Sequence, residues 1–170
     1  TIIDELKEKG KEPIILDAGN LFFKKKTLDP GVTTESAKVN TEIIVDSYNI
    51  IGCDAFSPGI NDFALGLNYI LDLQGKANFD FISSNITYKN EPEKLIFSSY
   101  KIIKKNKKHI AVIGLTSKFT SDEVSFITPY DALVDVIKEV ENISDFIVLL
   151  FDGKDQELNT FYTGDLNIDL

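Results

Sequence analysis

Short apolar runs alternate along the chain with longer segments whose apolar residues recur every three or four positions. The runs end in small or polar turn residues, which predicts buried strands over 13–17, 53–57, 79–83, 110–115 and 145–150. The longer segments predict helices over 2–9, 33–51, 65–73 and 129–141. Strands that alternate with helices predict an α/β protein.

Several local features refine this prediction. Residues 95–103 and 110–115 flank a Lys-Asn-Lys turn, so we interpret them as an antiparallel hairpin that makes the sheet mixed. Residues 24–32 and 85–93 are expected to be loops, and residues 159–170 show no clear period, although their end resembles the start of a strand. No repeat or linker interrupts the pattern, so we expect one domain over 1–170. On the helix over 33–51 we expect one shared side for Val39, Ile43, Ile44, Ser47 and Ile51.

The charge balance excludes one class of function. The 170 residues carry a net charge of −9, and Lys supplies all 18 basic side chains because Arg is absent. A nucleic-acid surface needs a basic face, so we expect no nucleic-acid partner for this acidic protein. The lysine clusters at 24–26 and 104–108 fall in predicted turns and are interpreted as solvated. No apolar run approaches the roughly 20 residues of a membrane span.

Two reactive residue types occur once each. Cys53 lies beside an apolar run with no histidine near it in the sequence, which favours a buried structural thiol over a nucleophile. His109 lies at the entrance of a predicted strand and is interpreted as a surface residue.

Polar side chains follow the predicted strands at Asp17, Asn20, Asn61, Asp62 and Asp152. Open α/β sheets keep their sites at the carboxyl ends of strands, where these oxygens would form a site suited to Mg²⁺ or Ca²⁺. Asp and Asn are also the residues that turns and helix caps prefer, and we favour this second interpretation.

Five segments resemble, in order and spacing, those of the calcineurin-like metallophosphoesterases, in particular the bacterial 5'-nucleotidase branch. The segments are 15–22, 54–66, 79–86, 109–116 and 147–153. The pattern Gly-Asn-His-Glu-Phe-Asp-x-Gly of that branch reads Gly-Ile-Asn-Asp-Phe-Ala-Leu-Gly over 59–66. The resemblance implies a metallophosphoesterase-like layered mixed β-sheet with flanking helices, part of a four-layer sandwich. It also implies a periplasmic or extracellular location.

The same resemblance implies that the catalytic positions are degenerate. The family holds two metal ions with carboxylates, an Asn carbonyl and imidazoles. Here Asn20 stands at the position of the bridging Asp, Ile60 at that of the Asn ligand, and Asp152 at that of a His ligand. Asn61 replaces the His that assists the leaving group, and Ala64 replaces the Asp that orients it. Two further ligand motifs of the family would precede residue 1 and follow residue 170.

We therefore expect a catalytically degenerate relative, without a cofactor, that serves as a scaffold or protein-interaction subunit. A metal-dependent phosphoester hydrolase with an altered, all-oxygen Mg²⁺ or Ca²⁺ site is one alternative. A nucleotide-binding module that does not hydrolyse its ligand is another, in which Phe22, Phe63 and Phe151 stack on a base. Aromatic residues at such positions are more often part of the core, which is the interpretation we favour.

Overall fold

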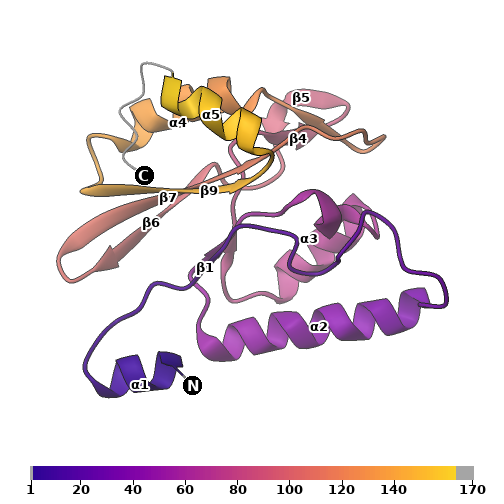
Figure 1. Ribbon diagram of the computed structural model, residues 1–170, viewed down its shortest axis with the longest axis horizontal. Coiled ribbons are helices and arrows are strands. Elements are labelled where there is room, and N and C mark those ends of the chain that lie inside the picture. The colour runs from indigo at the N-terminus through magenta and orange to yellow at the C-terminus, as the bar shows by residue number, and fades with distance from the viewer. Residues whose placement is uncertain (1, 164–170) are drawn as a thin grey trace.

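The computed structural model describes residues 2–163 (Figure 1). Its helical elements are α1 Ile2–Glu8, α2 Thr34–Ile51, the 3₁₀ turn η1 Ile60–Phe63, α3 Leu67–Lys76, α4 Pro129–Val140 and α5 Asp155–Thr163. Its strands are β1 Leu16–Asp17, β2 Ala55–Phe56, β3 Asp80–Phe81, β4 Ile86–Tyr88, β5 Glu91–Leu95, β6 Tyr100–Lys105, β7 Lys108–Thr116, β8 Val124–Phe126 and β9 Phe146–Asp152. Within these residues the strands form a parallel sheet β1-β2-β3, an antiparallel sheet β5-β4-β8 and a mixed sheet β6-β7-β9.

Alternation along β7 creates two of the apolar layers. Successive side chains of a strand point to opposite faces. Val112 therefore packs toward the first sheet, in one cluster with Ala55 and Ile82. Its neighbour Ile113 packs in a second cluster with Leu133 of α4. Both faces of β7 are buried, which explains its continuous apolar run.

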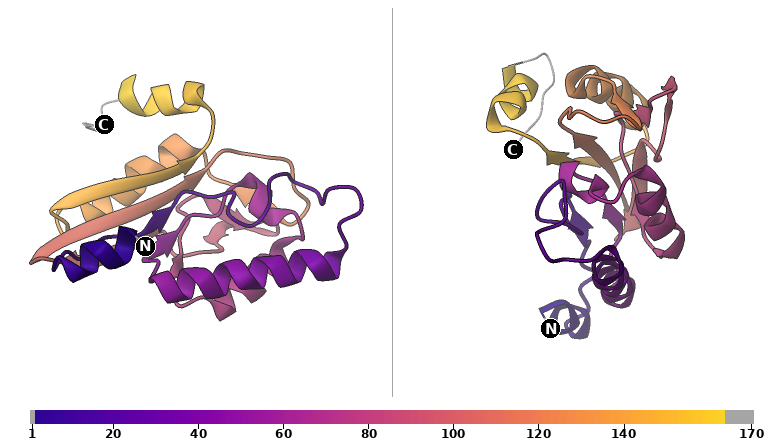
Figure 2. Two further views of the ribbon diagram at one scale, coloured as in Figure 1. Left: turned by 60° about the horizontal axis from the view of Figure 1, so that its bottom comes forward. Right: turned by 90° about the vertical axis from the view of Figure 1, so that its right-hand side faces the viewer.

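The first sheet is covered on its outer face by α2 and α3. Phe56 and Phe81 meet edge to face, with ring centroids 4.8 Å apart, and share an apolar cluster with Val45 of α2 and Ile70 of α3. The order of layers is therefore helices α2 and α3, sheet β1-β2-β3, sheet β6-β7-β9, then α4 and α5 (Figures 1 and 2). This architecture confirms the predicted α/β class, with layered sheets of mixed direction and flanking helices.

The predicted side of α2 is wrong. Val39 and Ile43 are more than half exposed, whereas Ala37, Thr41 and Val45 are buried. Small residues allow the helix to approach the sheet closely, and the Thr41 hydroxyl has a hydrogen-bond partner in Tyr69. The ends of α2 were predicted well because Thr33 caps the first turn and Gly52 ends the helix in the left-handed region.

Three further predictions need correction. Residues 85–93 are not a loop, since β4 and β5 pair there as a hairpin, and the strand predicted over 95–103 begins only at Tyr100. Residues 159–163 belong to α5, while residues 164–170 lie outside the described residues. The strand predicted over 145–150 exists, but Phe146 and Ile147 at the start of β9 are exposed.

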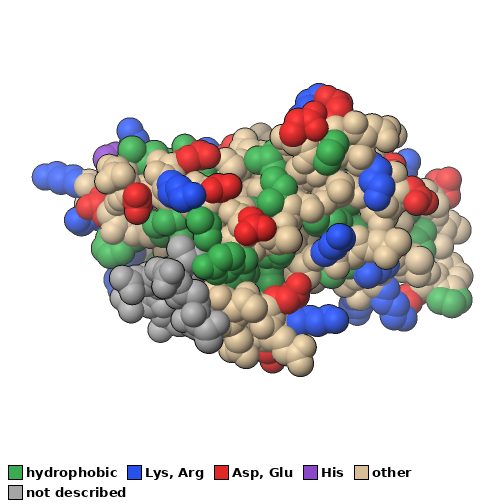
Figure 3. All heavy atoms as spheres, turned by 90° about the horizontal axis from the view of Figure 1, so that it is seen from above, with side chains coloured by type: hydrophobic (Ala, Val, Ile, Leu, Met, Phe, Trp, Pro, Cys, Tyr) green, Lys and Arg blue, Asp and Glu red, His purple; other side chains and the backbone are tan. Residues whose placement is uncertain are grey.

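The hairpin β6–β7 and the helix α4 form as predicted. Asn106 and Lys107 occupy the two turn positions with positive φ, which matches the right-handed twist of the strands. Pro129 opens α4 after a Thr128 cap. No helix within residues 2–163 is long and apolar enough to cross a membrane. The face seen in Figure 3 carries interspersed acidic and basic side chains.

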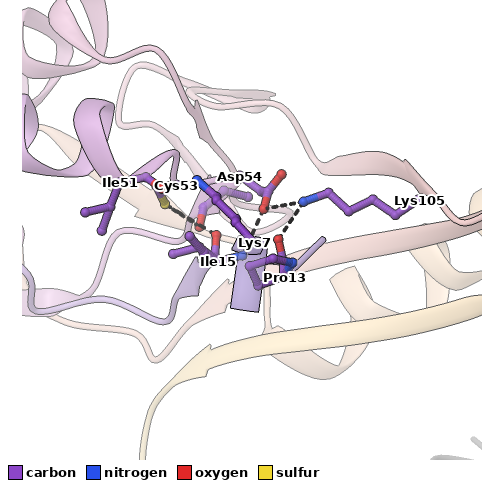
Figure 4. Close-up of polar contacts among 8 residues, drawn as sticks. Lys7, Pro13, Ile15, Ile51, Cys53, Asp54 and Lys105 are labelled. Atoms are coloured by element: carbon purple, nitrogen blue, oxygen red, sulfur yellow. Dashed lines mark hydrogen bonds and ion pairs between the residues drawn. The ribbon is translucent and has the colours of Figure 1, made fainter. Parts of the chain in front are cut away.

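The amino-terminal edge of the first sheet holds a largely buried ion pair (Figure 4). Lys105 donates to the Pro13 carbonyl at 2.6 Å and lies 3.4 Å from the Asp54 carboxylate, which also accepts the Ile15 N–H at 2.8 Å. Beside it Cys53 is buried, as expected, and burial raises the pKa of its thiol to about 12. The thiol is therefore protonated at neutral pH and unreactive.

Candidate functional site

The carboxyl ends of β1, β2, β7 and β9 meet at one edge of the sandwich. Thr116 at the end of β7 donates its hydroxyl to the Pro58 carbonyl after β2, at 2.6 Å. The Ser117 N–H donates to the Asp152 carbonyl at 2.7 Å, and the Ser57 N–H to the Asp17 carbonyl at 2.9 Å. This edge, which we call the strand-end edge, brings the turns after all four strands together.

Asp62 is the centre of the strand-end edge. It is 1% exposed, and its carboxylate accepts the main-chain N–H groups of Asn20 at 2.7 Å, Phe22 at 2.8 Å and Gly59 at 2.8 Å. The first two belong to the turn after β1 and the third to the turn after β2, so one side chain holds both turns. Burial raises the pKa of Asp62 to about 7, against the opposite effect of the three N–H donors.

Asn20 and Asp152 form the outer part of the same edge. The Asn20 amide donates to the Asp152 carboxylate at 2.7 Å, and its carbonyl accepts the Asn61 N–H at 2.8 Å. The other Asp152 oxygen accepts the Ile60 N–H at 2.7 Å. Turning the amide over would set its oxygen against a carboxylate, so both partners fix its orientation. Asn20 has a φ of 55°, a conformation that Asn adopts more readily than most residues.

Two glycines let these turns approach each other. A Cβ on Gly19 would lie 2.6 Å from the Gly59 nitrogen, and Gly19 has a φ of +110°. A Cβ on Gly59 would lie 2.7 Å from both the Asn20 nitrogen and the Asp152 carboxylate. Any other residue at either position would push the turns apart.

Asp17 lies at the end of β1 but is directed elsewhere. One of its oxygens accepts the Gly19 N–H at 2.9 Å, and the other accepts the Tyr48 hydroxyl at 2.7 Å. Burial and the neighbouring carboxylate raise the pKa of Tyr48. The structure thus brings together Asn20, Asn61, Asp62 and Asp152, while Asp17 fixes its own turn to α2.

The remaining site positions have local roles in η1. Asn61 donates its amide to the Lys24 carbonyl at 3.1 Å, which anchors the loop over 24–32. Ala64 ends the 3₁₀ turn through an N–H bond to the Asn61 carbonyl at 3.0 Å. Ile60 is half-buried and contributes only its main chain.

The donor set does not fit a pair of transition-metal ions. Within residues 2–163 no group of three or more His, Cys, Asp and Glu side chains is placed to hold a metal. Ile60 offers no side-chain ligand, and the Asn20 amide turns its N–H donors toward Asp152. His109 begins β7, whereas the strand-end edge lies at Thr116, about 23 Å further along the strand at about 3.3 Å per residue.

The aromatic residues beside the motif turns pack inside the protein. Phe22 is buried and stacks on Phe81 with ring centroids 6.2 Å apart. Phe63 contacts Phe119 at 5.4 Å, and Phe151 meets the ring of Phe161 at 5.1 Å. Their surroundings are those of core residues, in agreement with the interpretation that we favoured.

The main-chain donors of the strand-end edge were not predicted from the sequence. The N–H groups of Phe22, Gly59 and Ile60 supply donors that no residue type reveals. Thr116 is likewise a site residue by position, since its hydroxyl holds the turn after β2. The available signal was the small, turn-forming Gly19, whose spacing from Asp17 is typical of an Asx turn.

No protein-family model matches the chain. A 5'-nucleotidase of Vibrio parahaemolyticus is 31% identical over 118 residues, which are 69% of this chain and 20% of that protein. The solved structure of a sulfate thiohydrolase, SoxB, from Thermus thermophilus in complex with glycerol aligns with a TM-score of 0.78 at 18% identity, over 96% of this chain and 31% of its own. The calcineurin-like phosphoesterase YfkN from Bacillus subtilis aligns with a TM-score of 0.70 at 17% identity, over 88% of this chain and 51% of its own.

These comparisons agree with the layered α/β fold. The two solved structures show the shared fold, and the Vibrio relative adds similarity in sequence. The chain spans about a fifth of that relative's length. From the fold, the order of its motif turns and this kinship, the chain belongs to the calcineurin-like metallophosphoesterase superfamily, and within it to the 5'-nucleotidase branch.

Proposed function

We propose that the chain is a catalytically degenerate relative of the 5'-nucleotidase catalytic domain and acts as a scaffold or protein-interaction subunit. One observation carries the proposal: the side chains at two former ligand positions are bonded to each other. Asn20 and Asp152 form a hydrogen bond of 2.7 Å, and the remaining oxygens of both accept main-chain N–H groups. A metal ion at these positions would have to displace hydrogen bonds that the side chains already make.

The hydrogen bonds also offer a way for the edge to stay closed that requires no metal ion. In the family two cations would hold carboxylates together. Here Asn20 replaces a negative charge with a neutral amide that donates to Asp152. Positions 20 and 152 therefore do not place two carboxylates against each other, and no cation is needed to neutralise a repulsion between them.

The rest of the proposal follows from family membership and charge. We expect a periplasmic or extracellular location, as the resemblance to the family implies, and we expect residues 1–170 to form one domain. The expected partner is a protein and not a nucleic acid, because the net charge is −9. We expect no resident cofactor.

The alternative hydrolase would need a new site built from oxygen ligands. Mg²⁺ and Ca²⁺ prefer such ligands, and four of the five oxygen-bearing residues converge at the strand-end edge. Side-chain oxygens of Asn20, Asp62 and Asp152 already accept main-chain N–H groups, so a cation that used these oxygens would have to break those hydrogen bonds.

Hydrolysis by the full-length protein distinguishes the two. The protein with its natural ends would be assayed on AMP and p-nitrophenyl phosphate with Mg²⁺, Mn²⁺ or Zn²⁺, beside an Asp152→Ala variant. We expect equal, background rates from both. A rate well above that of the variant, restored by one of the ions, would overturn the proposal in favour of the hydrolase.

A further inference from the structure

A cavity of about 400 Å³ lies next to the strand-end edge and is not part of it. It is formed by the loop between β7 and β8, by β8 and by the residue that follows β4. Its walls include Lys89, Lys118, Phe119, Thr120, Ser121 and Phe126. None of these residues belongs to the hydrogen-bonded set at Asn20, Asp62 and Asp152.

Positive charge gathers at this cavity in a chain whose net charge is −9. Lys89 and Lys118 line it and are exposed. The Lys26 ammonium lies 5.5 Å from the centre of the Phe119 ring, which forms one wall. Two acidic residues lie on the same loop. The Glu123 carboxylate accepts the Leu67 N–H at the start of α3, at 2.9 Å. Asp122 is exposed on the same loop.

The Ser121 hydroxyl is a third hydrogen-bond donor at the cavity, beside the two lysine ammonium groups. Its oxygen accepts the N–H groups of Glu123 at 3.1 Å and Val124 at 3.2 Å. Both of its usual acceptor positions are thus used, and among residues 2–163 no acceptor is found for its own proton. A ligand at this hydroxyl must therefore accept a hydrogen bond.

The apolar wall of the cavity consists of aromatic rings that pack against one another. Phe119 meets Phe126 edge to face at 4.8 Å and packs against Phe63 of η1 at 5.4 Å. Three rings in contact hold the cavity's shape, and they offer apolar surface beside the charged groups.

We propose that this cavity binds a small organic anion, whose phosphate, phosphonate or carboxylate group contacts Lys89, Lys118 and Ser121 while its apolar body lies against Phe119 and Phe126. Anionic oxygens accept charge-assisted hydrogen bonds from all three polar groups. The volume exceeds that of a bare inorganic anion and suits a molecule with a ring or short chain. The site is independent of the proposed loss of catalysis.

Titration with phenylphosphonate, followed by the shifts of backbone amide resonances, tests the proposal. A phosphonate cannot be hydrolysed as an ester, so the result does not depend on whether the protein is an enzyme. We expect saturable shifts centred on residues 118–126 and Lys89. Shifts centred on residues 59–62, or no shifts at millimolar ligand, would overturn the proposal.

Matched variants identify the charges that bind. The double variant Lys89→Gln/Lys118→Gln is expected to weaken binding about tenfold or more, since each lysine contributes a charge-assisted bond. The control Lys104→Gln/Lys107→Gln, on the β6–β7 hairpin, has the same net charge as the double variant at the cavity. It should bind phenylphosphonate as tightly as the natural protein does. Equal weakening by both pairs would reduce the effect to overall charge and overturn the site. Inorganic phosphate that binds as tightly as phenylphosphonate would overturn the role of the aromatic wall.

Discussion

The two central sheets are linked by polar contacts at opposite edges of the sandwich, and the two links differ in chemistry. At the amino-terminal edge Lys105 of β6 meets Asp54 before β2, and this ordinary ion pair also reaches the Pro13 carbonyl. At the strand-end edge Asp152 of β9 accepts hydrogen bonds from the Asn20 amide and the Ile60 N–H, two uncharged donors. A flexible lysine adapts to its partner, whereas the second link depends on the shape and orientation of one amide.

The two links depend to different degrees on the identity of individual residues. The ion pair is about four-fifths buried and could be replaced by other long side chains. The strand-end edge tolerates less, because Asp62, Asn20 and Asp152 each serve two or three donors or partners. Replacing any of them leaves at least one main-chain N–H group without its acceptor.

The largest expected effect is that of Asp62→Ala. Three main-chain N–H groups would lose their acceptor, so we predict that the free energy of unfolding falls by about 3–5 kcal/mol. Urea denaturation followed by circular dichroism measures it. Asp46→Ala, on the exposed side of α2, is the matched control and should change stability by less than about 0.5 kcal/mol. A loss for Asp62→Ala as small as the control's would remove Asp62 from the centre of the edge.

The next effect is a pH dependence carried by Asp62. Its pKa of about 7 in the folded protein lies above the value of about 3.9 in an unfolded chain, so the folded state binds the proton more tightly. The stabilising contribution is complete below about pH 4 and is lost as the pH rises to about 7, on the order of 4 kcal/mol in total. NMR titration of the Asp62 side-chain carboxyl should give a midpoint near 7. A midpoint near 4 would show that the N–H donors outweigh burial.

A smaller effect is expected for Asn20→Asp. The new carboxylate would face Asp152 at the distance of the present hydrogen bond, so stability should fall by about 1–3 kcal/mol at neutral pH. The Asn20→Ala variant loses the hydrogen bond without adding a charge, so its stability should fall by less than that of Asn20→Asp. If Asn20→Asp were as stable as the natural protein, the edge would not depend on a neutral amide.

The smallest effect is expected at the opposite edge. Lys105→Gln removes a largely buried charge and should lower the free energy of unfolding by about 0.5–1.5 kcal/mol. Its exposed neighbour gives the control Lys104→Gln, expected to be neutral within about 0.5 kcal/mol. A loss at Lys105 larger than at Asn20 would reverse the comparison of the two edges.

Apolar periodicity predicted the elements that have a buried face of their own. The run over 110–115 became β7, and Pro129 opened α4 as expected. Periodicity failed where burial and composition diverge. β5 contains Glu91, Glu93 and Lys94 and is mostly exposed, so it has no apolar pattern to read. On α2 the apolar Val39 and Ile43 face outward, and only packing against the sheet selects the other side.

The candidate site was predictable in outline only. Strand ends indicated where Asn20, Asn61, Asp62 and Asp152 would gather, because parallel strands end at one edge. The 132 residues that separate Asn20 from Asp152 gave no sign that these two would bond directly. The three main-chain N–H groups that donate to Asp62 could not be predicted either, since main-chain donors are the same for nearly every residue.

The most direct test of the degenerate edge is anomalous X-ray scattering from crystals of the full-length protein grown with excess Mn²⁺. We predict no manganese peak beside Asn20, Asn61 and Asp152, and an intact bond between Asn20 and Asp152. Two manganese ions seated together next to Ile60, with that bond broken, would contradict the proposal that internal hydrogen bonds have replaced the metal site.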